Sequence, residues 1–175
     1  MYCAIIGDII GSRKIPDRNK AQIMLKKILD EINREYAPYI AAKFIITIGD
    51  EFQGLLKNPN MLLEIIDTIK FNFYPYRLRI GVGFGEIYTE IIEDMALGSD
   101  GPVYYAARDA VNSLKEAETK YGQPEQDILL YSNNHKEKFA LVNVALSLCA
   151  YMENGWTGKQ REAIAYLYFA DKSQR

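Results

Sequence analysis

Two aspartates stand at the ends of short apolar runs, each beside a glycine, where a carboxylate can bind a cation. Asp8 lies in the motif GDIIGS, and Asp50 lies in IGDEF. Hard divalent cations prefer carboxylate oxygens, and backbone N–H groups around Gly11 and Ser12 can face phosphate oxygens. Two carboxylates at one rim repel each other unless a cation lies between them or one takes up a proton. We therefore predict a divalent-cation site formed by Asp8, Asp50 and the backbone carbonyl of Ile9. The alternative is that each aspartate only caps its own turn.

The apolar pattern of the chain predicts the elements that would bring these residues together. Short apolar runs predict strands over residues 2–7, 44–48, 52–56, 78–86 and 128–131. Apolar positions at helical spacing predict helices over residues 19–36, 62–73, 103–117, 136–152 and 157–170. In this split β-α-β order the first strand pairs with the third, and the hairpin tip lies near the C-terminal end of the first strand. We expect an α+β fold with a ferredoxin-like antiparallel sheet, helices on one face and additional C-terminal helices.

Three alternating glycines interrupt the expected strand over residues 78–86, namely Gly81, Gly83 and Gly85. Their spacing is not that of a dinucleotide-binding turn, which needs GxGxxG between a strand and a helix. Glycines on one face of a strand leave room for a second backbone to approach closely. We interpret them as structural.

Composition and charge narrow the class of protein. The 175 residues are 49% hydrophobic, which excludes a disordered chain. The formal charge of −2 does not favour electrostatic binding of the whole chain to nucleic acid or to an anionic membrane. Cys3 and Cys149 form no CxxC pair, so we interpret both as small, buried hydrophobic residues. The low cysteine content also indicates a reducing, cytoplasmic compartment. The longest apolar run, residues 139–152, is shorter than the ~20 residues that span a bilayer, so we expect no membrane segment. The polar stretch 132–138 predicts a boundary between a domain over residues 1–132 and a helical segment over 133–175.

Four motifs in the same order resemble class III nucleotide cyclases: GDIIGS, TIGDEF, RIGVGFGE and GPVYYAAR. The resemblance implies that Asp8 and Asp50 bind metal and that Arg108 contacts phosphate in the transition state. It also implies a nucleoside triphosphate as ligand, a Mg²⁺ or Mn²⁺ ion, and a homodimer with the site between subunits. Asp100 is placed to serve as a base-selecting acid in this resemblance.

Two positions depart from the cyclase pattern. Ile46 stands where cyclases carry a base-recognising lysine, and Tyr104 stands where they carry a ribose-orienting asparagine. Groups for metal and phosphate are therefore retained, whereas those that read base and ribose are not. We predict a catalytically degenerate nucleotide-binding domain, with no purine specificity indicated.

The last residues begin like a helix-turn-helix. Thr157 and Gln160 have the spacing of a capping box, and Ser173 is placed to cap a second helix after a turn. The stretch WTGKQREAIAYL resembles the opening of a sigma-factor-like helix-turn-helix, whose recognition helix would lie beyond Arg175. This resemblance implies that DNA is bound through the missing C-terminal part in the full-length protein.

A cyclase-like domain followed by this segment resembles the SatD family along the whole chain. The resemblance implies a bacterial cytoplasmic regulator with DNA-binding capacity. Three functions stay open. The first is a regulator with a degenerate metal- or nucleotide-sensing domain joined to a DNA-binding module. The second is a divergent metal-dependent nucleotidyl cyclase, and the third is a structural relic in which the two aspartates only cap turns.

Overall fold

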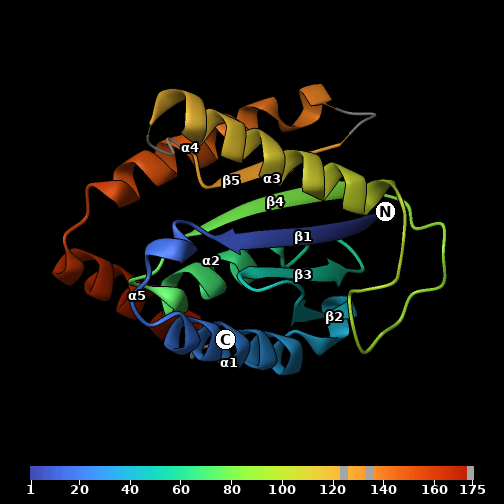
Figure 1. The fold of residues 1–175 in the computed structure, drawn as a ribbon, viewed down its shortest axis with the longest axis horizontal. Coiled ribbons are helices and arrows are strands. Elements are labelled where there is room, and N and C mark those ends of the chain that lie inside the picture. The colour runs from blue at the N-terminus through green and yellow to red at the C-terminus, as the bar shows by residue number, and fades with distance from the viewer. Residues whose placement is uncertain (123–125, 133–135, 173–175) are drawn as a thin grey trace.

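A five-stranded mixed sheet forms the centre of the protein, which we describe from a computed structural model covering residues 1–122, 126–132 and 136–172 (Figure 1). The strands are β1 (Tyr2–Ile9), β2 (Ile40–Ile46), β3 (Glu51–Leu56), β4 (Leu78–Gly85) and β5 (Ile128–Tyr131). They lie in the order β2-β3-β1-β4-β5, and only the β4–β5 pair is parallel among the described strands. The predicted α+β class and the pairing of the first strand with the third are confirmed.

The described residues also form five α-helices and three short 3₁₀ helices, of which η3, α4 and α5 follow the last strand. The α-helices are α1 (Arg18–Glu35), α2 (Leu62–Phe73), α3 (Pro102–Tyr121), α4 (Ala140–Asn154) and α5 (Gly158–Lys172). The 3₁₀ helices are η1 (Ser12–Lys14), η2 (Ala37–Tyr39) and η3 (Lys136–Phe139). Asp17 caps α1, because its side chain accepts a hydrogen bond from the backbone N–H of Lys20 at 2.9 Å. None of the helices in the described part of the chain is long and apolar enough to cross a membrane.

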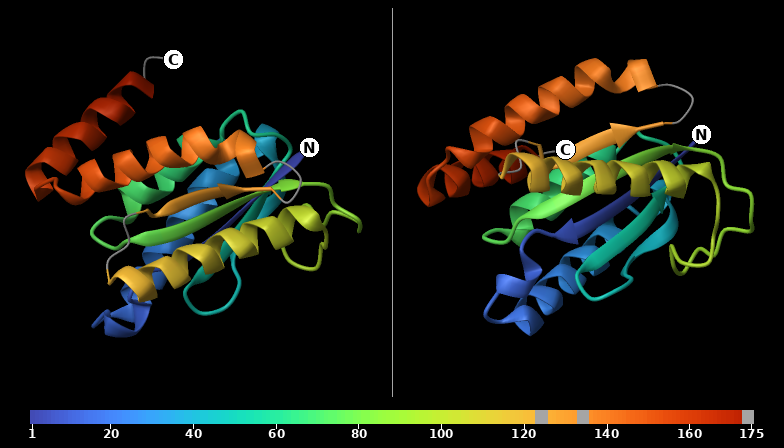
Figure 2. Two further views of the ribbon diagram at one scale, coloured as in Figure 1. Left: turned by 90° about the horizontal axis from the view of Figure 1, so that it is seen from above. Right: turned by 45° about the horizontal axis from the view of Figure 1, so that its top comes forward.

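The helices cover both faces of the sheet, whereas we expected them on one. Alternate residues of β1 point to opposite faces: Ile5 packs in the core with α1 and α2, and Ile6 packs in a second core with α3. Figure 2 shows α3 on one side of the sheet and α2 on the other. Helical periodicity predicts an apolar stripe on each helix but not the face of the sheet that the stripe covers.

The glycines of β4 explain how α3 reaches its face. A Cβ atom at Gly81 would collide with the backbone of α3 at Ala107 and Val111, and one at Gly83 would collide with it at Val103 and Ala107. These glycines therefore let helix and strand approach backbone to backbone, and their structural interpretation is confirmed.

The C-terminal helices pack onto the rest of the fold. Phe139 stacks on Phe84 with ring centroids 4.5 Å apart, and Tyr168 of α5 lies 5.5 Å from Phe71 of α2. The predicted capping box is present, since the Gln160 N–H donates to Thr157 Oγ1 at 3.3 Å and the Thr157 N–H donates to Gln160 Oε1 at 2.9 Å. Residues 133–135, at the predicted domain boundary, and 173–175, with the predicted second cap, lie outside the described residues.

A charged rim as the candidate functional site

The hairpin between β2 and β3 lies against the C-terminal end of β1. The backbone N–H of Ile9 donates to the carbonyl of Asp50 at 3.1 Å, and Asp8 is the cross-strand neighbour of Glu51. The turn is tight because Gly49 adopts φ +60° and the Glu51 N–H closes back onto Ile48 at 3.0 Å. The backbones of both predicted metal-binding aspartates therefore lie at one rim of the sheet.

The carboxylate of Asp8 is buried and each of its oxygens pairs with a cation. Oδ1 accepts a hydrogen bond from Arg79 Nη1 at 2.7 Å, and Oδ2 lies 2.6 Å from Lys115 Nζ. Arg79 is the register partner of Asp8 on β4, so both side chains point to the same face, toward α3. Arg79 also pairs with Glu118 of α3. Because Asp8 is only 6% exposed, these two cations provide most of the compensation for burying its charge.

Arg108 forms a second ion pair at this rim, with Glu51. Its Nη2 donates to Glu51 Oε1 at 2.8 Å and its Nη1 contacts Oε2, which makes the pair bidentate. The hydrogen bonds to Glu51 raise the pKa of Arg108, and this effect exceeds the opposing effect of partial burial. We call the set formed by Asp8, Glu51, Arg79, Arg108, Lys115 and Glu118 the charged rim.

Asp50 does not join this set in the structure. It lines a narrow recess of about 10 Å³ beside α1, together with Ile9 and Ser12. Gln22 of α1 donates to the carbonyl of Gly49 and so holds the turn toward α1. Asp8, by contrast, pairs with residues on the α3 side of the sheet.

The side chains as placed do not fit a divalent cation shared by Asp8 and Asp50. An ion at Asp8 would have to displace Lys115 or Arg79, because both carboxylate oxygens are already paired at 2.6–2.7 Å. The described residues contain no cluster of three or more His, Cys, Asp or Glu side chains able to hold a metal. The third predicted ligand is the backbone carbonyl of Ile9, and the hydrogen bond from the Ile9 N–H to the Asp50 carbonyl brings this residue to the same rim.

The other predicted site residues lie at two separate places. Gly11, with φ +65°, precedes the short helix η1, and Ser12 begins that helix close to the end of β1. Asp100 precedes α3, next to the end of β4 that pairs with the start of β1, so it lies at the opposite end of the sheet from Asp8. Its Oδ2 accepts a hydrogen bond from the Tyr105 hydroxyl at 2.6 Å. Within this chain, Asp100 is not brought to the charged rim.

Four members of the charged rim were missed from sequence alone: Glu51, Arg79, Lys115 and Glu118. Glu51 and Arg79 lie inside motifs that the sequence singled out, but their pairing depends on strand register. Lys115 follows Arg108 by seven residues, a spacing that places both on one helix face. That spacing, with an arginine at the start of a buried strand, is the signal that could have indicated the network.

Several solved structures are similar to this chain. They include a bacterial light-regulated adenylyl cyclase, with TM-score 0.49 and 14% identity over 74% of each chain. They also include the dimeric guanylyl cyclase domain of the RhoGC fusion protein from Blastocladiella emersonii, with TM-score 0.45 and 18% identity over 61% of this chain and 71% of that one. A third is the guanylate cyclase domain of RhGC from Catenaria anguillulae in complex with GTP, with TM-score 0.40 and 18% identity over 61% and 69%.

Sequence comparison gives a more extensive match. A comparison with curated proteins found none that matches. The model of the SatD family matches residues 2–175.

Proposed function

Because this chain belongs to the SatD family, we propose that it is a bacterial cytoplasmic regulator with two parts. Its cyclase-like domain binds a nucleoside triphosphate without converting it, and the segment over residues 133–175 contributes to DNA binding.

The pairing of Asp8 carries the proposal that the domain is catalytically degenerate. A cyclase-type reaction needs the carboxylate of Asp8 for metal and the guanidinium of Arg108 for phosphate. Here Asp8 pairs with Arg79 and Lys115, and Arg108 pairs with Glu51. These groups are therefore engaged with one another rather than open to a reacting phosphate.

Tyr104 supports the same conclusion. It stands where a ribose-orienting asparagine is expected, yet it is 8% exposed and packs in the core between its own helix, α3, and the sheet. Its hydroxyl has no hydrogen-bond partner in the described part of the chain. A side chain enclosed in this way does not orient a ribose at the surface.

The loop after β1 supports binding of phosphate. Gly11 and Ser12 are followed by Arg13 and Lys14, which are both exposed and belong to η1. Backbone N–H groups beside two basic side chains suit an anionic ligand. We place the phosphates of the proposed nucleotide here, and the metal site at Asp8 and Asp50 has no part in this proposal.

Calorimetric titration with ATP, GTP, CTP and UTP, in Mg²⁺ and again in EDTA, tests the proposal. We expect binding in both buffers and no cyclic nucleotide in the product analysis. Lys14→Gln should weaken binding, whereas Lys26→Gln, at an exposed position of α1, serves as the matched control. Formation of a cyclic nucleotide that depends on Asp8 would establish the divergent cyclase instead, and absence of any binding would favour the structural relic.

We also propose that the protein is a homodimer that associates through α4. Leu141, Val144, Leu148 and Met152 lie at helical spacing and are 80%, 58%, 61% and 63% exposed. An uncharged apolar stripe of this kind is typical of a protein interface. Leu148→Glu should convert a dimer to a monomer in light scattering, and Ile23→Glu, at an exposed isoleucine of α1, should not. A wild-type monomer would contradict the proposal.

A further inference from the structure

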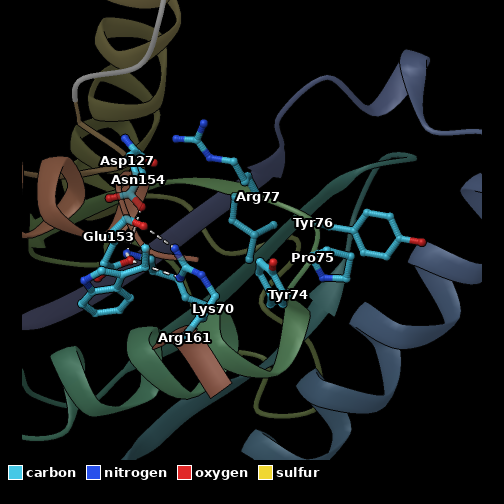
Figure 3. Close-up of a pocket in the computed structure, with 11 residues that line it drawn as sticks. Lys70, Tyr74, Pro75, Tyr76, Arg77, Asp127, Glu153, Asn154 and Arg161 are labelled. Atoms are coloured by element: carbon cyan, nitrogen blue, oxygen red, sulfur yellow. Dashed lines mark hydrogen bonds and ion pairs between the residues drawn. The ribbon is translucent and has the colours of Figure 1, made fainter. Parts of the chain in front are cut away.

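A cavity of about 220 Å³ lies where the C-terminal helices meet the sheet, outside the charged rim (Figure 3). One part of its lining comes from the end of α2, the segment before β4 and the residue before β5, namely Lys70, Tyr74, Arg77 and Asp127. The other part comes from α4 and α5 and their connection, namely Glu153, Trp156 and Arg161. The volume corresponds to roughly seven liquid waters, enough for one flat ring system.

Most charges of this cavity already neutralise one another. Lys70 Nζ lies 2.9 Å from Asp127 Oδ2 and 3.1 Å from Glu153 Oε2. Burial lowers the pKa of Lys70, but the two carboxylates more than offset this and the pKa is raised, so the side chain stays cationic. Arg161 donates from Nη2 to the Glu153 carbonyl at 2.7 Å. These contacts balance the charges of Lys70, Glu153 and Arg161 against one another.

Two polar groups of the cavity remain unused among the described residues. Asp127 is 8% exposed, and its Oδ1 is buried without a donor. Arg77 is exposed and forms no ion pair with any described residue. A ligand that completes this cavity therefore needs an N–H donor for the carboxylate and an anionic group for the arginine.

The aromatic residues that line the cavity, Tyr74 and Trp156, indicate the shape of that ligand. The guanidinium of Arg161 lies 5.1 Å from the centroid of the Tyr74 ring and 5.3 Å from that of Trp156. Guanidinium and aromatic planes both accept a flat ring by stacking. A flat ring with N–H donors, linked to an anionic group, describes the base and phosphate of a nucleotide.

We infer that this cavity is a second nucleotide site, separate from the phosphate-binding loop over residues 11–14, and that it binds the base of a nucleotide with its phosphate against Arg77. The ligand class rests on the proposed function, whereas the position is derived from the cavity itself. Because the cavity is lined from both parts of the molecule, the bound base would hold α4 and α5 against the cyclase-like domain. The cavity therefore gives the sensor a physical link to the C-terminal segment.

Trp156 is the only tryptophan of the chain, which makes its fluorescence a direct reporter of this cavity. The full chain is titrated with AMP, GMP, CMP and UMP, and with ribose 5-phosphate as a probe that lacks a base. We expect a saturable change in tryptophan emission with at least one nucleotide and none with ribose 5-phosphate. Arg77→Gln should weaken that binding about tenfold, because a charge-assisted hydrogen bond is lost. Arg34→Gln, at an exposed arginine of α1, is the matched control.

A second variant and calorimetry separate the possible failures. Asp127→Asn keeps the size of the side chain and should also weaken binding, and circular dichroism checks that the variant folds. If that variant is unfolded, Arg77→Gln decides. Nucleotide binding that is lost in Lys14→Gln, unchanged in Arg77→Gln and silent in Trp156 would overturn the inference but leave the proposed function standing. Absence of binding by calorimetry would overturn both.

Discussion

Asp8 places a negative charge where little water reaches it, and two cations from different elements neutralise that charge. Arg79 comes from the neighbouring strand and Lys115 from the helix above. The sequence identified Asp8 as chemically important, because a carboxylate at a strand end beside a glycine is unusual in an apolar strand. It could not identify the partner of the carboxylate. A position at the end of a strand is equally compatible with a metal ion and with a basic side chain from another element.

The ion pairs of Asp8 predict a stability effect that a metal ligand would not have. Asp8→Asn leaves two cations without their shared carboxylate, and we expect a loss of about 3 kcal/mol in the free energy of unfolding. Asp50→Asn should cost much less, because the half-buried Asp50 carboxylate forms no ion pair with the described residues. Urea denaturation of both variants in EDTA measures the difference. Equal losses, or losses that appear only when Mn²⁺ is present, would contradict the ion-pair interpretation.

Tyr104 predicts a loss of stability at alkaline pH. Burial raises the pKa of its hydroxyl to about 12, from a reference value of 10.0. The neutral form is favoured in the folded state, so this contribution to stability is complete below pH 10 and is lost as the pH rises through 12. Thermal melting of the wild type and Tyr104→Phe across this window measures the effect. The phenylalanine variant should lose less stability, and parallel curves would contradict the assignment.

At the scale of elements, the contact between β4 and α3 shows what the sequence predicts and what it does not. The apolar stripe of α3 predicted a helix over residues 103–117, and the structure has one over Pro102–Tyr121. The alternating glycines of β4 were identified as a site of close approach. Their partner and its face of the sheet follow from tertiary packing, which helical periodicity does not encode. Because the contact places α3 on the face of the sheet opposite α1 and α2, it explains why helices cover both faces.

Gly83→Ala tests this close contact. The added Cβ would collide with the carbonyl of Val103 and the N–H nitrogen of Ala107 on α3. Backbone atoms cannot rotate away, so we expect a loss of about 3 kcal/mol, comparable with overpacking at a rigid core site. Gly155→Ala is the control, because its Cβ would meet only Met152 O at an ordinary 3.4 Å. Chemical denaturation of both variants decides, and a stable Gly83→Ala variant would refute the contact.

At the scale of the whole molecule, the sequence indicated a sheet topology that the structure bears out. The rim where β1 meets the hairpin was predicted from the split β-α-β plan, and the hydrogen bond between Ile9 and Asp50 confirms it. The cavity lined by Lys70, Trp156 and Arg161 was not predicted. Its lining residues come from the segment before β4 and from the α4–α5 connection, which are distant in sequence and carry no shared motif.

The overall charge predicts weak contact with nucleic acid for residues 1–175. With a formal charge of −2, the chain provides little drive to release counterions from phosphates. In the last helix, Arg161 is held by Glu153, which leaves Lys159 as an exposed cation of its first turn. We expect non-specific binding at roughly 10⁻⁴ M or weaker, lost as salt rises. Fluorescence anisotropy with a labelled duplex measures it, and tight sequence-specific binding by this chain would show that the segment reads DNA directly.

The side chain of Asn143 in α4 covers the free edge of the sheet at β5. β5 is one of the two edge strands of the sheet. The backbone N–H of its Leu130 donates to Asn143 Oδ1, and the Leu130 carbonyl accepts a hydrogen bond from Asn143 Nδ2, both at 2.9 Å. The side-chain amide thus imitates the peptide group of an absent sixth strand. An open β-edge is a template on which another chain can add a strand. Helix α4 therefore blocks strand addition at this edge through the single side-chain amide of Asn143. Any event that lifts α4 from β5 would also expose a surface suited to intermolecular strand pairing.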